Sequence, residues 1–150
     1  MSFVLFERIA APVERIYAHL SEPASFLGLQ PLLVEITETG RGSDADGRPT
    51  RSFRSIERLL LLGVLPYRNT ITTRMTLASA NERIECEVES PGKVRLRNAF
   101  TLRAEGEESV VGDDVAVECP RWLRFFVVGE ALKAHQRMLR NLKRRMEERR

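Results

Sequence analysis

A histidine stands where the sequence otherwise predicts an apolar helix surface. His135 lies between Leu132 and Leu139, in a segment whose apolar residues recur at three- and four-residue steps. A histidine changes its charge near neutral pH and can pass a proton in either direction. His135 is therefore a candidate acid, base or hydrogen-bonding group toward a carbonyl or phenol. The alternative is an ordinary, partly solvated histidine at the edge of the helix stripe.

Further polar side chains interrupt apolar faces in the segments that alternate like strands. Tyr67, Asn69 and Thr73 fall on the same face of one predicted strand as its apolar residues. Asn98 does the same in another predicted strand. A mostly apolar pocket uses a few placed polar groups of this kind to orient a ligand. Alternatively, these groups satisfy one another or buried water, as inner-face polar groups must.

Asp113 is the one carboxylate with inward parity in the last predicted strand, and it stands beside Asp114. With an inward side chain, Asp113 is a candidate acid; alternatively, the pair shapes a strand end and both carboxylates reach water. The candidate catalytic residues are therefore His135 and Asp113, and no recognisable catalytic constellation joins them.

The common signatures of catalysis and metal binding are missing from the sequence. It contains no GxSxG, P-loop, GxGxxG or HExxH motif. The stretch from Asp44 to Gly47 lacks the other ligands of a calcium loop and predicts a hairpin turn. Cys86 and Cys119 lack CxxC spacing, which favours two buried, reduced thiols, with a disulfide left open. We expect no metal and no cofactor.

The composition is that of one globular domain. The chain has 150 residues, of which 43% are hydrophobic and 30% charged. Its N-terminal segment carries Glu7 and Arg8 where a signal peptide would be apolar. The most apolar run, residues 59–65, is too short to span a membrane as a helix. We expect a cytoplasmic protein that is not an integral membrane protein.

Charge is distributed unevenly along the chain. Residues 121–150 carry ten Lys and Arg against three Glu, whereas residues 1–120 carry fourteen Lys and Arg against eighteen Asp and Glu. Cations near the C-terminus of a helix complement its macrodipole and need no partner. The alternative is a basic surface for an acidic protein, RNA or a membrane.

The order of predicted elements indicates an α+β fold. A strand over residues 3–9 feeds two short helices, the first opened by Pro12 and the second ended by Gly28 and Pro31. Six strands follow, over residues 32–39, 51–62, 67–78, 83–89, 94–104 and 109–119, with a turn around Gly63 and Pro66. Short connections predict a mostly antiparallel sheet. A long helix over about residues 120–147 ends the chain.

This last helix has one apolar stripe and one basic stripe. The apolar stripe contains Trp122, Phe125, Phe126, Gly129, Leu132, Leu139, Leu142 and Met146, and the basic stripe contains Lys133, Arg137, Arg140 and Arg144. The concave face of the sheet is the one large apolar surface available to the first stripe. A strongly curved sheet around one helix is expected to leave a cavity between them.

The chain resembles the START-like (SRPBCC) superfamily, in particular its polyketide cyclase/dehydrase branch. The resemblance lies in FERIAAPVERIYAHLSEPASFLGLQPLLVEI, LLGVLPYRNTI and VVGDDVAVECPRWLRFFVVGEALKAHQRMLRNLK, which together span nearly the whole chain. It implies a helix-grip fold over residues 1–150 as a single ligand-binding domain. It also implies a hydrophobic cavity for a lipid, a polyketide or another small apolar molecule.

Three functional hypotheses follow. The first is binding or transport of an apolar small molecule; the second is a polyketide cyclase, aromatase or dehydratase acting in the same cavity; the third is docking of an acidic partner through the basic helix. We expect no nucleic-acid partner and leave a homodimer open. The predicted ligand-binding residues are Tyr67, Asn69, Thr73, Met75, Asn98, Phe100, Phe126, Leu132 and His135.

Overall fold

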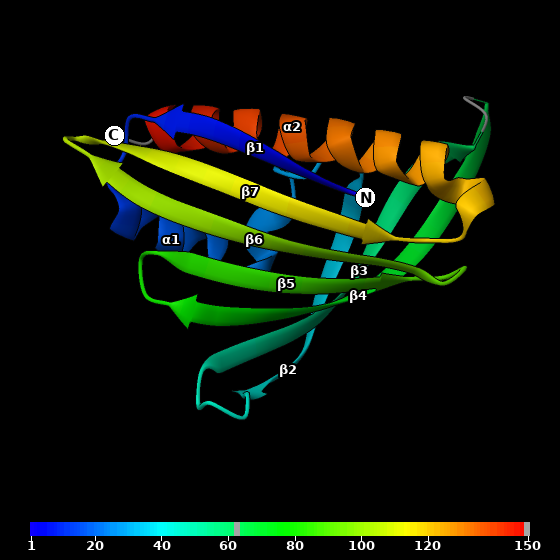
Figure 1. The fold of residues 1–150 in the computed structure, drawn as a ribbon, viewed down its shortest axis with the longest axis horizontal. Coiled ribbons are helices and arrows are strands. Elements are labelled where there is room, and N and C mark those ends of the chain that lie inside the picture. Colours follow the sequence, from blue (N-terminus) through cyan, green and yellow to red (C-terminus); the bar gives the residue numbers. More distant parts are fainter. Residues whose placement is uncertain (62–63, 149–150) are drawn as a thin grey trace.

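The fold is one curved antiparallel sheet closed by a long helix (Figure 1). The computed structural model describes residues 1–61 and 64–148. The elements are β1 (Ser2–Ile9), α1 (Val13–Leu20), η1 (Pro23–Phe26), β2 (Leu33–Ser43), β3 (Pro49–Leu61), β4 (Leu65–Ser79), β5 (Arg83–Ser90), β6 (Val94–Glu105), β7 (Glu108–Glu118), η2 (Arg121–Leu123) and α2 (Arg124–Glu148). The predicted element order is confirmed, with a 3-10 turn as the second short helix. Leu62 and Gly63, a predicted strand end and turn, lie outside the described residues.

The sheet is a meander to which the first strand returns. Its order is β1-β7-β6-β5-β4-β3-β2, and every neighbouring pair is antiparallel. Short turns join β2 through β7, as hairpin connections require. In the β2–β3 turn, Asp44 accepts hydrogen bonds from the backbone N–H groups of Asp46 and Arg48. That turn confirms the hairpin predicted there.

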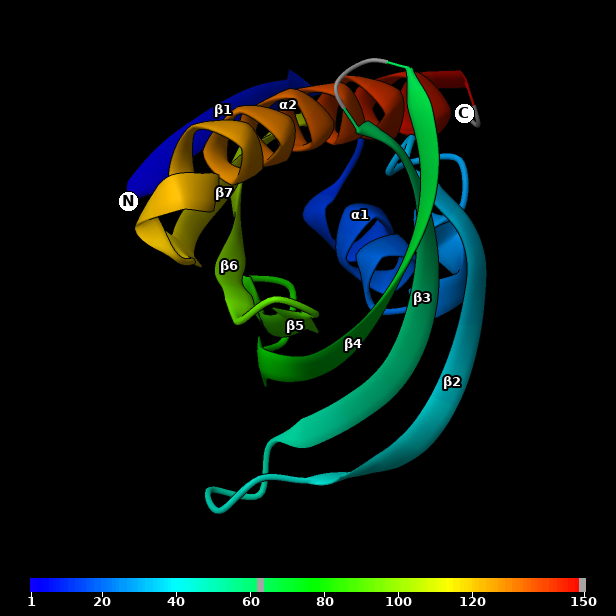
Figure 2. The ribbon, with the colours of Figure 1, turned by 90° about the vertical axis from the view of Figure 1, so that its right-hand side faces the viewer.

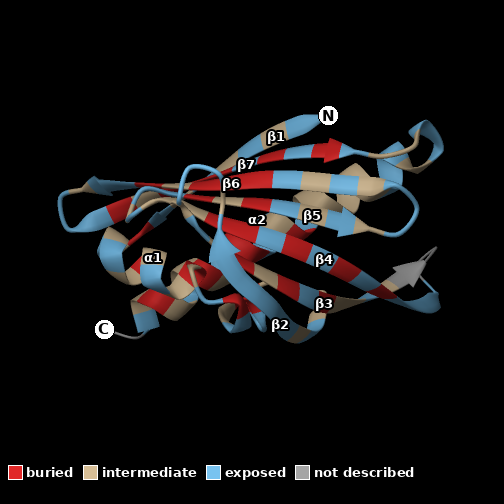
Figure 3. Cartoon of the chain, turned by 90° about the horizontal axis from the view of Figure 1, so that it is seen from below, coloured by how far each residue is buried: buried red, intermediate tan, exposed pale blue. Residues whose placement is uncertain are grey.

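The sheet is strongly curved, and α2 lies across the open side of the curve (Figure 2). Short helix α1 lies inside the curve. Pro12 precedes α1, and Glu14 in its first turn suits the positive end of the helix dipole. Buried and exposed residues alternate along the strands (Figure 3), since one face lies against the core and the other against solvent.

The second half of α2 is anchored in the core. Met138, Leu139, Leu142 and Met146 are buried in one hydrophobic cluster with residues of α1, η1 and the sheet. Polar contacts reinforce this anchor: Asn141 donates to the carbonyl of Leu29.

The C-terminal part of α2 also holds the loop that follows η1. Arg145 donates to the carbonyls of Ser25 and Leu27 at 2.7 and 3.1 Å. Gly28 has a φ of 84°, and a Cβ there would lie 2.8 Å from the Arg145 guanidinium. A side chain at this position would therefore strain the backbone and displace the arginine.

The first turns of the helix predicted over about residues 120–147 depart from the prediction. Trp122 and Phe125, placed in the inward apolar stripe by their spacing, are 82% and 93% exposed. The chain leaves β7 at one end of the sheet, so η2 and the start of α2 lie at the rim and not over the centre (Figure 1). Helical spacing cannot show where along the sheet a helix begins.

The C-terminal half of α2 and the η2 turn that precedes α2 should respond differently to loss of a leucine. Leu142→Ala should lower the free energy of unfolding by about 2–5 kcal/mol, because its side chain is fully buried. Leu123→Ala should cost about 1 kcal/mol or less, because Leu123 borders empty space. Urea unfolding of both variants tests this, and equal losses would contradict the contrast between the anchored C-terminal half of α2 and the unfilled end of the fold at η2.

Candidate functional site

A cavity of about 490 Å³ lies between the sheet and the first half of α2. Most of its wall is aliphatic or aromatic. The lining residues are Gln30, Leu32, Glu57, Leu59, Tyr67, Asn69, Ile71, Val88, Ser90, Pro91, Val94, Leu96, Trp122, Leu123, Phe126, Val127, Glu130, Ala131, Ala134 and His135. Its size and apolar wall are those of a small-molecule site.

Strand alternation brings the polar groups of this wall together. Residues two apart on one strand point to the same face, so Glu57 shares the inner face with Leu59, and Asn69 shares it with Tyr67. The register of β3 and β4 places Glu57 opposite Asn69 and Leu59 opposite Tyr67. The cavity wall is therefore built from cross-strand pairs.

A hydrogen-bonded chain runs from the sheet to His135. Asp113 is fully buried; its Oδ2 lies 2.5 Å from His135 Nδ1, and its Oδ1 accepts from Asn98 Nδ2 at 3.0 Å. A buried carboxylate needs such partners, because an unpaired charge away from water is costly. The alternative placement, in which Asp113 and Asp114 both reach water, is wrong: only Asp114 is exposed.

This chain gives His135 a defined orientation. When Nδ1–H of a neutral imidazole donates to a carboxylate, Nε2 is left as a proton acceptor. The ring borders the cavity, and Phe3 packs edge-on against it with ring centroids 6.1 Å apart. The arrangement Asp–His toward a cavity is suited to taking up or returning a proton at Nε2.

Glu57 is a second ionisable group in the same wall, and sequence reasoning missed it. Its carboxylate accepts hydrogen bonds from Gln30 Nε2 at 3.2 Å and Asn69 Nδ2 at 3.3 Å. Burial raises the pKa of Glu57, against smaller lowering effects of Asn69, Gln30 and His135. The carboxyl therefore keeps its proton to a higher pH than an ordinary glutamate does.

One signal in the sequence points to Glu57. It has the same parity as Phe53 and Ser55, which are buried, and as Leu59 in the cavity wall. A lone carboxylate on an inward parity is uncommon and often functional. Gln30 had no comparable signal, since it lies in the loop between η1 and β2.

The structure separates the predicted ligand-binding residues into two groups. Tyr67, Asn69, Phe126 and His135 line the cavity. Thr73, Met75, Asn98, Phe100 and Leu132 are not among its lining residues. Met75 and Phe100 belong to the filled core, where Phe100 packs against Phe26, and Asn98 holds Asp113. The inner face of the sheet continues beyond the cavity, so inward parity alone did not separate the two environments.

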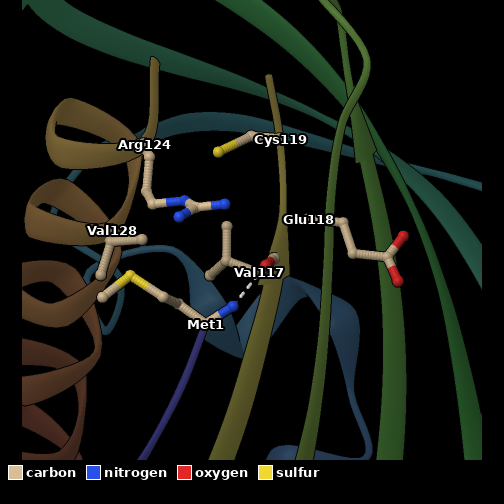
Figure 4. Close-up of a pocket in the computed structure, with 6 residues that line it drawn as sticks. All are labelled: Met1, Val117, Glu118, Cys119, Arg124 and Val128. Atoms are coloured by element: carbon tan, nitrogen blue, oxygen red, sulfur yellow. Dashed lines mark hydrogen bonds between the residues drawn. The ribbon is translucent and has the colours of Figure 1, made fainter. Parts of the chain in front are cut away.

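A smaller hollow of about 250 Å³ lies where β1, β7 and α2 meet (Figure 4). The N-terminal amine of Met1 donates to the carbonyl of Val117 here, and the Arg124 side chain reaches in from α2. Cys119 is half-buried at this hollow, not buried as expected, because β7 ends one residue earlier. Cys86 is buried, and burial raises the pKa of its thiol to about 12; neither cysteine is in a disulfide.

Two further findings concern metal binding and membrane spanning. Among residues 1–61 and 64–148, no group of three or more His, Cys, Asp or Glu side chains is placed to hold a metal ion. Within the same residues, no helix combines the length and the apolar character that a membrane span needs.

Glu57 should make stability depend on pH in a predictable direction. Because its pKa is raised in the folded state, the free energy of unfolding should fall as pH rises from the ordinary glutamate range through the raised value. Glu57→Gln should reduce this fall, whereas the same substitution at exposed Glu87 should not. Urea unfolding at mildly acid and neutral pH measures the difference; an unchanged pH dependence in Glu57→Gln would refute the assignment.

Solved structures with the same architecture confirm the fold. A protein from Thermus thermophilus has 15% sequence identity and a TM-score of 0.78, with 99% of this chain and 98% of that chain covered. A START superfamily protein from Mycobacterium smegmatis has 17% identity and a TM-score of 0.74, with 99% of each chain covered. The Zhui aromatase/cyclase from Streptomyces sp. R1128 has 14% identity and a TM-score of 0.77, covering 99% and 94%.

The family assignment comes from the sequence. No curated protein matches the chain. The sequence model of one family, described as polyketide cyclase / dehydrase and lipid transport, matches residues 2–147. Since the match spans nearly the whole chain and the fold agrees, the chain belongs to the polyketide cyclase/dehydrase and lipid transport family.

Proposed function

We propose that the protein binds an apolar small molecule of the lipid or polyketide type in the cavity between the sheet and α2. The observation that carries this proposal is the unfilled volume of about 490 Å³ with a mainly apolar wall. Burying an apolar ligand there removes its surface from water. Each Å² of apolar surface buried contributes roughly 25 cal/mol of favourable free energy. The family description, which includes lipid transport, supports the same class of ligand.

The polar groups of the wall favour a ligand with one or two oxygen functions. Nε2 of His135 can accept a hydrogen bond, and a protonated Glu57 can donate one. A hydroxyl or carbonyl on an otherwise apolar skeleton would satisfy both groups. A purely hydrocarbon ligand would leave them without partners, which costs free energy.

The second candidate function is acid/base catalysis in the same cavity. It is favoured by the Asn98–Asp113–His135 chain together with the raised pKa of Glu57. For a β-hydroxy ketone, Nε2 of His135 would remove the proton next to the carbonyl. The electron pair forms the new C=C bond, the C–O bond breaks, and Glu57 gives its proton to the leaving hydroxyl, which departs as water.

Filling the cavity should weaken ligand binding. Ala131 borders the cavity, so Ala131→Phe should weaken the binding of a fluorescent fused-ring phenol by about tenfold or more. Ala18→Phe, on the exposed side of α1, is the matched control and should bind like the parent. Titration by fluorescence measures both affinities; equal binding by the parent and Ala131→Phe would show that the ligand lies elsewhere.

Catalysis should depend on His135 and not on the other histidine. If the parent dehydrates an aryl β-hydroxy ketone, His135→Gln should lower the rate by about 100-fold or more, and Asp113→Asn should also lower it. His19→Gln changes a histidine outside the cavity and should leave the rate unchanged. The absorbance of the conjugated product reports turnover. A parent rate equal to that of buffer would end the catalytic candidate and leave ligand binding standing.

A further inference from the structure

Large apolar side chains gather on the surface at the mouth of the cavity. Eleven such side chains are exposed in the described part of the chain, and six of them lie at this end: Val64, Leu65, Tyr67, Trp122, Phe125 and Phe126. They come from the start of β4 and the residue just before it, and from η2 and the first turn of α2, which lie at the same end of the molecule (Figure 1). Tyr67, Trp122 and Phe126 also line the cavity, so this apolar rim borders its opening.

Cations surround the apolar rim. Exposed Arg58 and Arg68 face each other across β3 and β4, and exposed Lys93 lies in the β5–β6 turn. Exposed Arg121 and Arg124 flank Trp122. None of these five cations forms an ion pair within residues 1–61 and 64–148.

Carboxylates at this end are fewer. Exposed Glu118 ends β7, half-buried Glu57 and Glu130 line the cavity, and exposed Glu89, near the end of β5, pairs with Arg95. The rim is therefore apolar at its centre and cationic around it.

We propose that this end of the molecule docks onto an anionic lipid surface. Tryptophan and phenylalanine favour the boundary between lipid headgroups and acyl chains. Lysine and arginine around them are attracted to anionic headgroups. The rim offers both features on segments that project from the same end. Docking places the mouth of the cavity against the apolar layer.

Charge disfavours a second copy of the chain as the occupant. In a two-fold dimer the same patch meets itself, so the five cations of one copy would approach those of the other. An anionic lipid surface instead neutralises them. The docking surface does not depend on what the cavity holds, because its apolar and cationic side chains are present without a ligand.

The position of the tryptophan allows a direct test. Trp122 is the one tryptophan in the sequence, so tryptophan fluorescence, excited selectively over the two tyrosines, comes from the rim. With vesicles of equal parts phosphatidylcholine and phosphatidylglycerol, the emission should shift to the blue, and brominated lipid should quench it. Phosphatidylcholine vesicles alone should bind at least about tenfold more weakly. Co-sedimentation gives the affinity independently.

Two pairs of variants separate the rim from the rest of the surface. Phe125→Ser should weaken vesicle binding about tenfold, whereas Phe6→Ser, which changes an exposed phenylalanine on β1, should not. The double change Arg121→Glu and Arg124→Glu should weaken binding about tenfold or more. The control is the double change Arg140→Glu and Arg144→Glu in the basic stripe of α2, which should weaken binding less.

Three results would overturn the proposal. Absence of binding to anionic vesicles is the first. Equal loss of binding in the rim and control variants is the second, since it would assign the interaction to overall charge. The third is a dimer in sedimentation velocity that Phe125→Ser dissociates, because a second copy would then occupy the rim. Binding of the fused-ring phenol is measured without vesicles, so failure of docking and failure of the proposed function are distinguishable.

Discussion

The structure depends on how one helix covers a strongly curved sheet. A seven-stranded sheet with an apolar concave face must bury that face, and α2 is the element that spans it. Other elements fill the space between sheet and helix only along the second half of α2, where α1 and η1 add Ile16, Leu20 and Phe26 to the core. Over its first half, nothing in the described chain fills the space. The cavity is thus a consequence of where the short helices lie.

The Asp113–His135 contact lies where these two halves meet. Ala134 beside His135 lines the cavity, whereas Met138, one turn later, belongs to the filled core. A fully buried carboxylate fixes the position of α2 along the sheet, because moving the helix would leave Asp113 without its histidine. The same contact orients the imidazole toward the cavity. One interaction therefore serves the fold and the candidate chemistry together.

Glu57 illustrates the cost of keeping polar groups in such a place. Burial raises its pKa, so the folded state loses stability when this carboxyl ionises. A leucine at this position would extend the apolar wall without that cost. Functional sites commonly retain groups that a stability-optimised core would replace. This cost is the physical reason for the proposal that Glu57 recognises the ligand.

Much of the fold could be predicted because its signals are local. Alternation of apolar and polar residues in 83–89 and 94–104 predicts two strands and their inner faces. The apolar stripe of the last segment predicts a helix. The site was less accessible, because it depends on contacts between distant segments. Glu57 meets Gln30 and Asn69, and Asp113 meets Asn98 and His135, only through sheet register and the placement of α2. The exposure of Trp122 could not be predicted for the same reason, because it depends on where the last helix begins along the sheet.

Chemical-shift mapping tests the central claim, that one half of the interior is filled and the other half is an open apolar site. A fused-ring phenol would be titrated into isotope-labelled protein while backbone amide signals are followed. The account predicts perturbations in the strand ends around Leu59, Tyr67 and Val94 and in α2 up to His135, with little change around Leu142 and Met146. Perturbations centred on the C-terminal half of α2, or none at saturating probe, would contradict it.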